Sequence, residues 1–117
     1  MNISDLCKKI AEKSSLLDNI LNNTKDSFFL FKETAQEIIK QMQKDSPETK
    51  FVFQNKSELE FEIRFGEDIL IFTMHTNIFE FSRQHEVMKL PYVTQDKERS
   101  FCGMINIYNF LSDSFDY

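Results

Sequence analysis

The eight residues Glu58-Leu59-Glu60-Phe61-Glu62-Ile63-Arg64-Phe65 alternate strictly between charged and apolar side chains. Successive side chains of a β-strand point to opposite faces, so this period of two predicts a strand with one buried and one solvated face. Gly66-Glu67-Asp68 comes next and predicts a hairpin loop, because glycine tolerates a positive φ. Ile69–Phe72 is apolar at every position, as in a strand that is covered on both faces. This stretch therefore predicts an antiparallel sheet.

Other parts of the second half also favour strands. They are Phe51–Phe53, with a turn at Asn55-Lys56, and then Ile78–Ser82, Val87–Tyr92 and Phe101–Leu111. Ile69–Ser82 also fits one long bent strand. Phe101–Leu111 fits a helix by spacing, but its β-branched and aromatic content favours a strand. Thr94–Ser100 is polar and predicts a loop, and the tail Ser112–Tyr117 has no clear period.

The first half of the chain has a helical pattern instead. Apolar residues recur there at steps of three and four, which indicates one apolar stripe. They are Ile3, Leu6, Cys7, Ile10, Leu17, Ile20 and Leu21, and then Phe28, Phe31, Ala35, Ile38, Ile39 and Met42. Asn22-Asn23-Thr24 predicts a break between two helices, and the second should end at Asp45-Ser46-Pro47 because proline disfavours a helical residue before it.

Helices followed by strands predict the α+β class. We expect one domain over residues 1–117, since a chain of 117 residues fits a single core. Its N-terminal helical pair, at about residues 3–45, would pack on an antiparallel meander of about five strands at about residues 51–111. Whether the chain is part of a longer protein or of a complex stays open.

The net charge of −5 lies in the second half of the chain. Residues 1–50 carry eight basic and eight acidic side chains, whereas residues 51–117 carry six and eleven. No basic face that could neutralise phosphates is visible, so neither nucleic acid nor an anionic membrane is an expected partner. The start, Met1–Asp5, does not have the pattern of a signal peptide, and no apolar run is long enough to span a bilayer. With only two cysteines, Cys7 and Cys102, we expect a cytoplasmic protein with reduced thiols.

Two groups of side chains could carry chemistry. Glu58, Glu60 and Glu62 share one face of a strand, where paired carboxylates could act as acid and base or bind a cation. The simpler interpretation is a solvated face, with Arg64 and lysines of a neighbouring strand relieving the repulsion. His75 or His85 could pair with Glu80 or Glu86 in a metal or enzyme site, but the spacing matches no familiar motif.

The cysteines and the basic residues of the second half indicate no site either. Cys7 lies on the helical stripe, where a small buried side chain is expected. Cys102 has no base beside it in sequence, as a nucleophile would need. Arg83, Lys97 and Arg99 alternate with acidic residues, which suggests a surface loop with ion pairs. We therefore predict no catalytic residue, no metal and no cofactor.

The most informative feature is the phenylalanine content, thirteen in all, with no tryptophan. Consecutive helical residues are about 100° apart, so Phe28, Phe29, Leu30 and Phe31 point all round the helix. One sheet cannot cover the whole circumference, and the remainder would contact another protein. We therefore predict a non-enzymatic interaction module that self-associates or docks on a protein partner through these four residues.

Two alternatives belong to other functional classes. A phenylalanine-lined pocket between helices and sheet could bind a small ligand, with polar contacts from Tyr92, Asn106 or Tyr108. An enzyme could instead use one histidine with a glutamate, provided that their side chains converge in one cleft.

Overall fold

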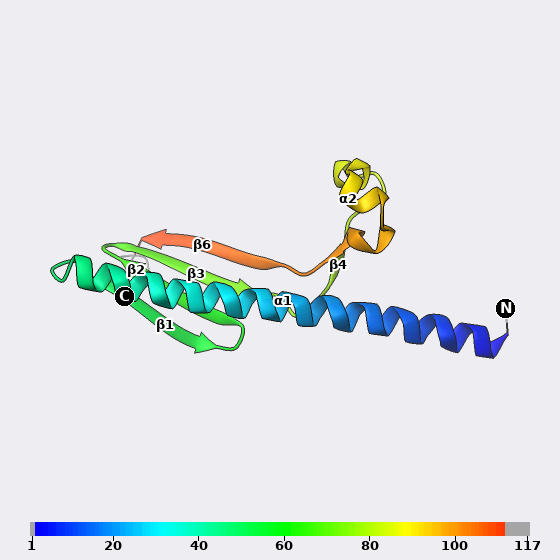
Figure 1. Ribbon diagram of the computed structural model, residues 1–117, viewed down its shortest axis with the longest axis horizontal. Coiled ribbons are helices and arrows are strands. Elements are labelled where there is room, and N and C mark those ends of the chain that lie inside the picture. The colour runs from blue at the N-terminus through cyan, green and yellow to red at the C-terminus, as the bar shows by residue number, and fades with distance from the viewer. Residues whose placement is uncertain (1, 112–117) are drawn as a thin grey trace. The chain divides into compact units, whose positions relative to one another are not determined.

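The computed structural model describes residues 2–111 (Figure 1). The chain divides into two compact units, one formed by residues 2–24 and 76–104 and the other by residues 25–75 and 105–111. One long helix and two antiparallel sheets make up most of the chain, which confirms the α+β class.

The predicted helical pair is a single helix, α1 (Ile3–Asp45). The expected break at Asn22-Asn23-Thr24 is wrong, because no glycine or proline lies within these 43 residues and asparagine alone costs a helix little. The Thr24 hydroxyl donates to the Ile20 carbonyl at 2.8 Å, a bond that a helix interior accommodates. Asn2 caps the start through a 2.8 Å bond from the Asp5 N–H, and the predicted end at Asp45 is confirmed.

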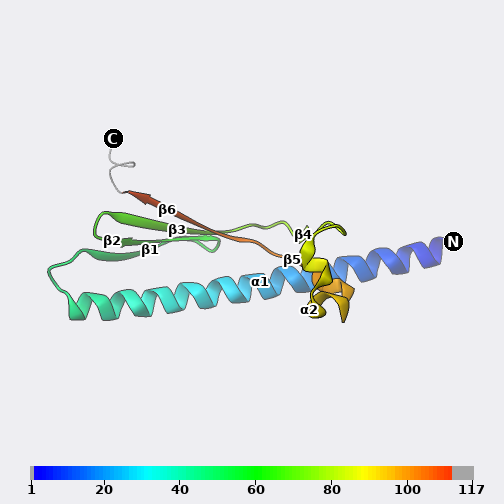
Figure 2. The same cartoon turned by 90° about the horizontal axis from the view of Figure 1, so that it is seen from above.

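The larger sheet has four antiparallel strands in the order β1-β2-β3-β6. Its strands are β1 (Phe51–Ser57), β2 (Glu60–Phe65), β3 (Asp68–Met74) and β6 (Ile105–Leu111). Figure 2 shows residues 25–45 of α1 lying over one side of this sheet. Gly66 has a φ of 63° in the β2–β3 hairpin, as predicted. The first turn falls at Glu58-Leu59 rather than Asn55-Lys56, because β1 continues through an irregularity in pairing between Asn55 and Ser57.

Aromatic rings form the core between α1 and this sheet. Phe61 of β2 is fully buried, and its ring stacks on that of Phe72 with centroids 4.5 Å apart. The ring of Phe28 from α1 lies 5.3 Å from Phe61 and is also buried. Ala35 and Ile39 continue the buried face of the helix. The alternation at residues 58–65 therefore placed the buried side of β2 correctly.

The other unit contains the small sheet of β4 (Phe79–Glu80) and β5 (Phe101–Cys102). Three short helical turns lie between them in sequence: η1 (Glu86–Lys89), α2 (Pro91–Thr94) and η2 (Lys97–Ser100). The strand predicted at Val87–Tyr92 is wrong. The His85 side chain accepts a bond from the Val87 N–H at 3.1 Å, which caps η1, and Pro91 begins α2.

The remaining strand predictions are partly confirmed. Phe101–Leu111 is extended, but Gly103 and Met104 separate β5 from β6. A Cβ atom on Gly103 would collide with the Thr24 side chain, so a residue without a side chain fits this approach to the helix. Ile78–Ser82 is reduced to the two residues of β4. The meander of about five strands is thus a four-stranded and a two-stranded sheet.

Candidate functional site

An open apolar groove lies beside α1 in the unit that holds the larger sheet. Its volume is ≈ 330 Å³. One wall comes from α1 and the floor from β2 and β3. Its lining residues are Phe31, Thr34, Ala35, Ile38, Ile39, Met42, Ile63, Phe65, Leu70 and Phe72. Thr34 is the only residue with a polar side chain among them, so the surface is suited to apolar contacts.

The groove exists because one helix is too narrow for four strands. An α-helix is about 10 Å across and strands are about 4.8 Å apart, so a single helix covers about two strands. Hydrogen bonds hold α1 over the β1 side of the sheet. Lys32 Nζ donates to the Ser57 carbonyl at 2.9 Å, and Gln43 Nε2 donates to the Phe51 carbonyl at 2.7 Å. The β3 side is therefore left open.

Strand β6 extends the open surface to the edge of the sheet. Ile107 pairs with Phe72 and so lies on the same face as the groove floor. Ile107 is 57% exposed and Leu111 is 59% exposed. β6 contains no charged residue and no proline, which are common protections of an edge strand against pairing with another chain. Asn109 is the partner of Leu70 and lies on this face between Ile107 and Leu111. The groove, Ile107 and Leu111 together form a mostly apolar area, which we call the groove surface.

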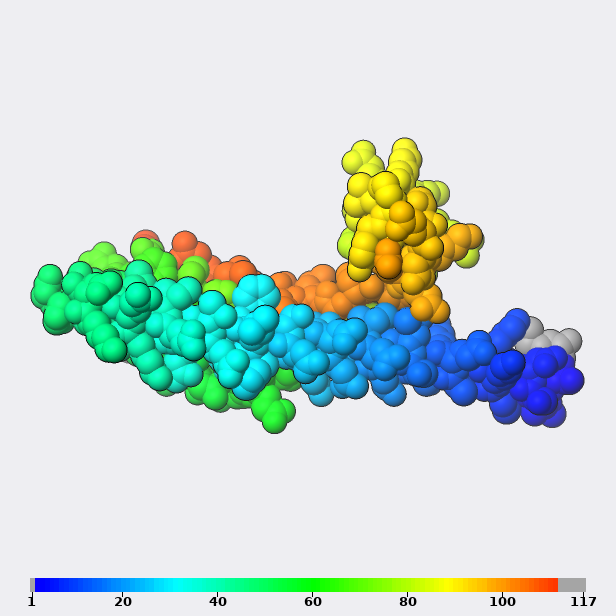
Figure 3. Space-filling view, in the orientation of Figure 1, coloured from blue at the N-terminus to red at the C-terminus, as the bar shows by residue number. Residues whose placement is uncertain are grey.

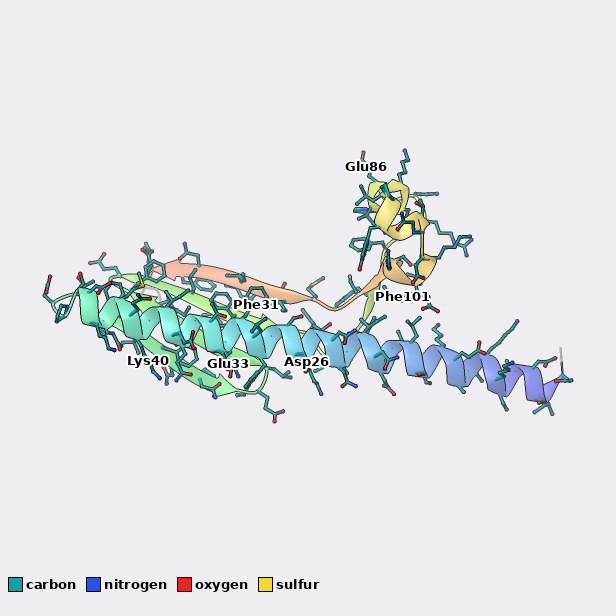
Figure 4. All side chains as sticks on the ribbon, in the orientation of Figure 1. Asp26, Phe31, Glu33, Lys40, Glu86 and Phe101 are labelled. Atoms are coloured by element: carbon teal, nitrogen blue, oxygen red, sulfur yellow. The ribbon has the colours of Figure 1, made fainter. Side chains whose placement is uncertain are left out.

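The four consecutive residues of the predicted interaction site have different surroundings. Phe28 is buried in the core, whereas Phe29, Leu30 and Phe31 are all more than half exposed. Figure 4 shows Phe31 on the β6 side of α1 and Lys40 on the opposite side. Phe31 lines the groove, and Leu30 does not. Phe29 lines a separate, more polar pocket together with Lys25 and other residues.

The residues suggested for a ligand pocket do not line the groove. Asn106 and Tyr108 lie on β6, and the pairing of Tyr108 with Ile71 places them on the face opposite to Ile107. Tyr92 belongs to the other unit, where the Arg99 guanidinium lies 4.4 Å from the centre of its ring. Ile38, Met42 and Ile107 were missed. The spacing of Ala35, Ile38, Ile39 and Met42 places them on one side of the helix but does not show which of them the sheet covers.

The acidic face of β2 is not simply solvated. The Glu62 side chain is only 13% exposed, and its carboxylate lies 3.9 Å from Lys56 Nζ and 4.0 Å from Arg64 Nε. The predicted relief of repulsion by Arg64 and a lysine is therefore confirmed, but Glu62 itself is mostly covered.

Cys7 is exposed rather than buried. Within residues 2–111, no three histidine, cysteine or acidic side chains are grouped as a metal site would need.

Another cavity, of ≈ 530 Å³, lies in the smaller-sheet unit. Arg83 and Lys97 line it together with Glu80 and Glu98. Arg99 donates from Nη1 to the Tyr92 carbonyl at 3.0 Å and lies 4.0 Å from Asp96. Opposite charges alternate here, as predicted for a surface loop, and they form no excess of positive charge for an anionic ligand.

Among the helices described, none is both long and apolar enough to cross a membrane. No protein-family model, no curated protein and no solved structure matches this chain. The groove surface therefore has to be interpreted from its own chemistry.

Proposed function

We propose that this chain is a non-enzymatic protein-interaction module, which self-associates or docks on a protein partner through the groove surface. The open half of the larger sheet supports this function. Phe31, Ile38 and Met42 stand exposed along the helix wall, and Ile107 and Leu111 stand exposed along β6. Contiguous apolar areas beyond a few hundred Å² are typical of interfaces.

The energetics favour burial of this surface by another protein. Removing apolar area from water stabilises by roughly 25 cal/mol per Å². An exposed ion pair contributes only about 0–1 kcal/mol. Completing the burial of two half-exposed side chains such as Phe31 and Ile38 thus outweighs what the surface charges contribute.

Self-association is tested by light scattering after size exclusion, at about 1–100 µM protein. We expect the mass to rise with concentration from 13.9 kDa towards twice that value. Phe31→Asp should remove the association, because it places a charge in the groove. Gln36→Asp makes the same change in charge at an exposed position of α1 outside the groove and should associate like the wild type. A wild type that stays monomeric throughout would reject self-association.

A small-ligand binding domain is a second candidate, supported by the volume of the groove. Pockets for small molecules commonly have about 300–1,000 Å³, and they combine apolar walls with a few convergent polar groups. Thr34 is the one polar lining residue that the groove supplies. An apolar fluorescent probe that binds the wild type but not Phe31→Asp, at a concentration where both are monomeric, would favour this candidate.

We propose a cytoplasmic location, which two unpaired thiols suit.

A further inference from the structure

The N-terminal turns of α1 carry an apolar stripe that the described residues leave uncovered. Ile3 is 81% exposed, Leu6 is 49% exposed and Ile10 is 58% exposed. Their spacing of three and four residues places them on one side of the helix. All residues from 2 to 15 are exposed, and Figure 3 shows these blue turns of α1 at the surface. We call Ile3, Leu6 and Ile10 the N-terminal stripe.

The groove surface is complementary to such a helix in shape and in chemistry. Amphipathic helices dock into apolar grooves through side chains at i, i+3 and i+7, and Ile3, Leu6 and Ile10 have this spacing. The half of the sheet next to β6 has room for one more helix. Charge also favours the pairing. Residues 3–13 carry three lysines and two acidic side chains, whereas residues 25–75 and 105–111 carry seven basic and ten acidic ones.

Within a continuous helix α1, the N-terminal turns cannot fold back onto a groove that the same helix borders. Ile3 and Phe31 both belong to the continuous helix α1, and their separation of 28 positions corresponds to about 42 Å along a helix axis. The stripe that occupies a groove must therefore come from a second copy. In a two-fold symmetric dimer, the stripe of each copy is buried in the groove of the other, so both grooves are occupied.

We infer that two copies associate by exchange, with the N-terminal stripe of each seated on the groove surface of the other. This inference rests on the proposed function and names its partner. Taking roughly 150–200 Å² for a fully exposed large apolar side chain, the groove surface and the stripe together expose about 750 Å² per copy. A standard interface buries about 800 Å² per partner, so the exchange supplies enough area for a stable dimer.

Two single substitutions break the two sides of the contact separately. Ile10→Asp disrupts the stripe and leaves the groove intact, whereas Ile38→Asp disrupts the groove and leaves the stripe intact. Each should raise the Kd of the homodimer at least tenfold, because both symmetric contacts then contain a buried charge. Ser15→Asp and Gln36→Asp are matched controls at exposed positions off the stripe and off the groove, and their Kd should stay within about twofold of the wild type.

Mixing the two variants gives the decisive measurement. In a mixed dimer, the intact stripe of Ile38→Asp meets the intact groove of Ile10→Asp, so one of the two contacts is restored. We expect the equimolar mixture to associate at least tenfold more tightly than either variant alone, as measured by sedimentation equilibrium. Far-UV circular dichroism of each variant confirms that the helix is retained.

The other outcomes separate the two proposals. A wild type that dimerises, with both variants weakened and no gain on mixing, overturns the exchange and keeps self-association. The same holds if neither variant weakens the dimer, or if the controls weaken it equally. A monomeric wild type at about 100 µM overturns both the exchange and the self-associating form of the proposed function.

Discussion

The two ends of α1 have the same sequence pattern and opposite surroundings. Phe28, Ala35 and Ile39 lie at helical spacing and are buried against the larger sheet. Ile3, Leu6 and Ile10 lie at the same kind of spacing and are exposed. The period of a helix determines which side is apolar but not what covers it. An apolar stripe that its own chain leaves bare is therefore a candidate interface, and the following changes test how far the two ends differ.

The largest difference in unfolding free energy should come from truncating one side chain at each end of α1. Phe28→Ala removes a buried ring that contacts Phe61, and it should lower the free energy of unfolding by about 3–5 kcal/mol. Ile3→Ala should change it by no more than about 0.5 kcal/mol. Urea denaturation followed by circular dichroism measures both, at one fixed protein concentration because association adds to stability. Equal losses at the two positions would show that the ends do not differ.

Two neighbouring isoleucines provide a closer comparison within one end. Ile39→Ala empties a buried position and should cost about 2–5 kcal/mol of unfolding free energy. Ile38→Ala shortens a side chain that is 51% exposed and should cost less than about 1 kcal/mol in the monomer. It should nevertheless weaken association. If Ile38→Ala destabilised the monomer as much as Ile39→Ala, the groove would be closed in solution.

The middle of α1 is tested at the contact between Gly103 and Thr24. Gly103→Ala forces a methyl group against the Thr24 side chain and should cost about 1–3 kcal/mol. Thr24→Ala removes the hydroxyl and methyl groups involved, so the cost of Gly103→Ala should be smaller in that background. Thermal unfolding of the four proteins of this cycle measures the coupling. Identical costs in both backgrounds would mean that these two residues are not in contact.

The smallest effect should come from the hydrogen bonds that hold α1 over β1. Gln43→Met removes the bond to the Phe51 carbonyl and should cost about 0.5–1.5 kcal/mol. Gln36→Met, on an exposed turn of the same helix, should change stability by less than about 0.5 kcal/mol. Hydrogen exchange of the β1 amides is a second readout. Unchanged exchange after Gln43→Met would indicate that packing alone positions the helix.

The sequence predicted the parts of the fold that local patterns determine. The strand predicted at 58–65 is found at Glu60–Phe65, and the turn at Gly66 and the end of the helix near Pro47 are also found. Features that depend on distant partners were missed. The register of β6 on β3 joins residues that are far apart in the chain, and nothing local indicates this pairing. The strand expected at Val87–Tyr92 failed because the capping bond from the Val87 N–H to His85 outweighed the β-propensity of the segment.

The candidate site was only partly predictable for the same reason. Counting aromatic residues at 28–31 correctly indicated that one sheet could not bury them all, and Phe31 is part of the groove surface. The groove itself arises because α1 sits on the β1 side, fixed by Lys32 and Gln43 through bonds to backbone carbonyls. Every residue has a backbone carbonyl, so the sequence does not indicate which carbonyls accept these bonds. Ile107 and Leu111 belong to the groove surface only because β6 pairs with β3.

The pairing of β6 with β3 has a consequence for synthesis on the ribosome. Met74 and Ile105 are paired, and residues 75–104 separate them in the chain. At about 5–20 residues per second, β6 is made roughly 2–6 s after β3. During that interval the outer backbone of β3 has no neighbouring strand, and an unpaired strand edge is prone to pairing with other nascent chains. A chain that ends before residue 105 therefore has the β2–β3 hairpin but lacks the strand that pairs with the outer edge of β3.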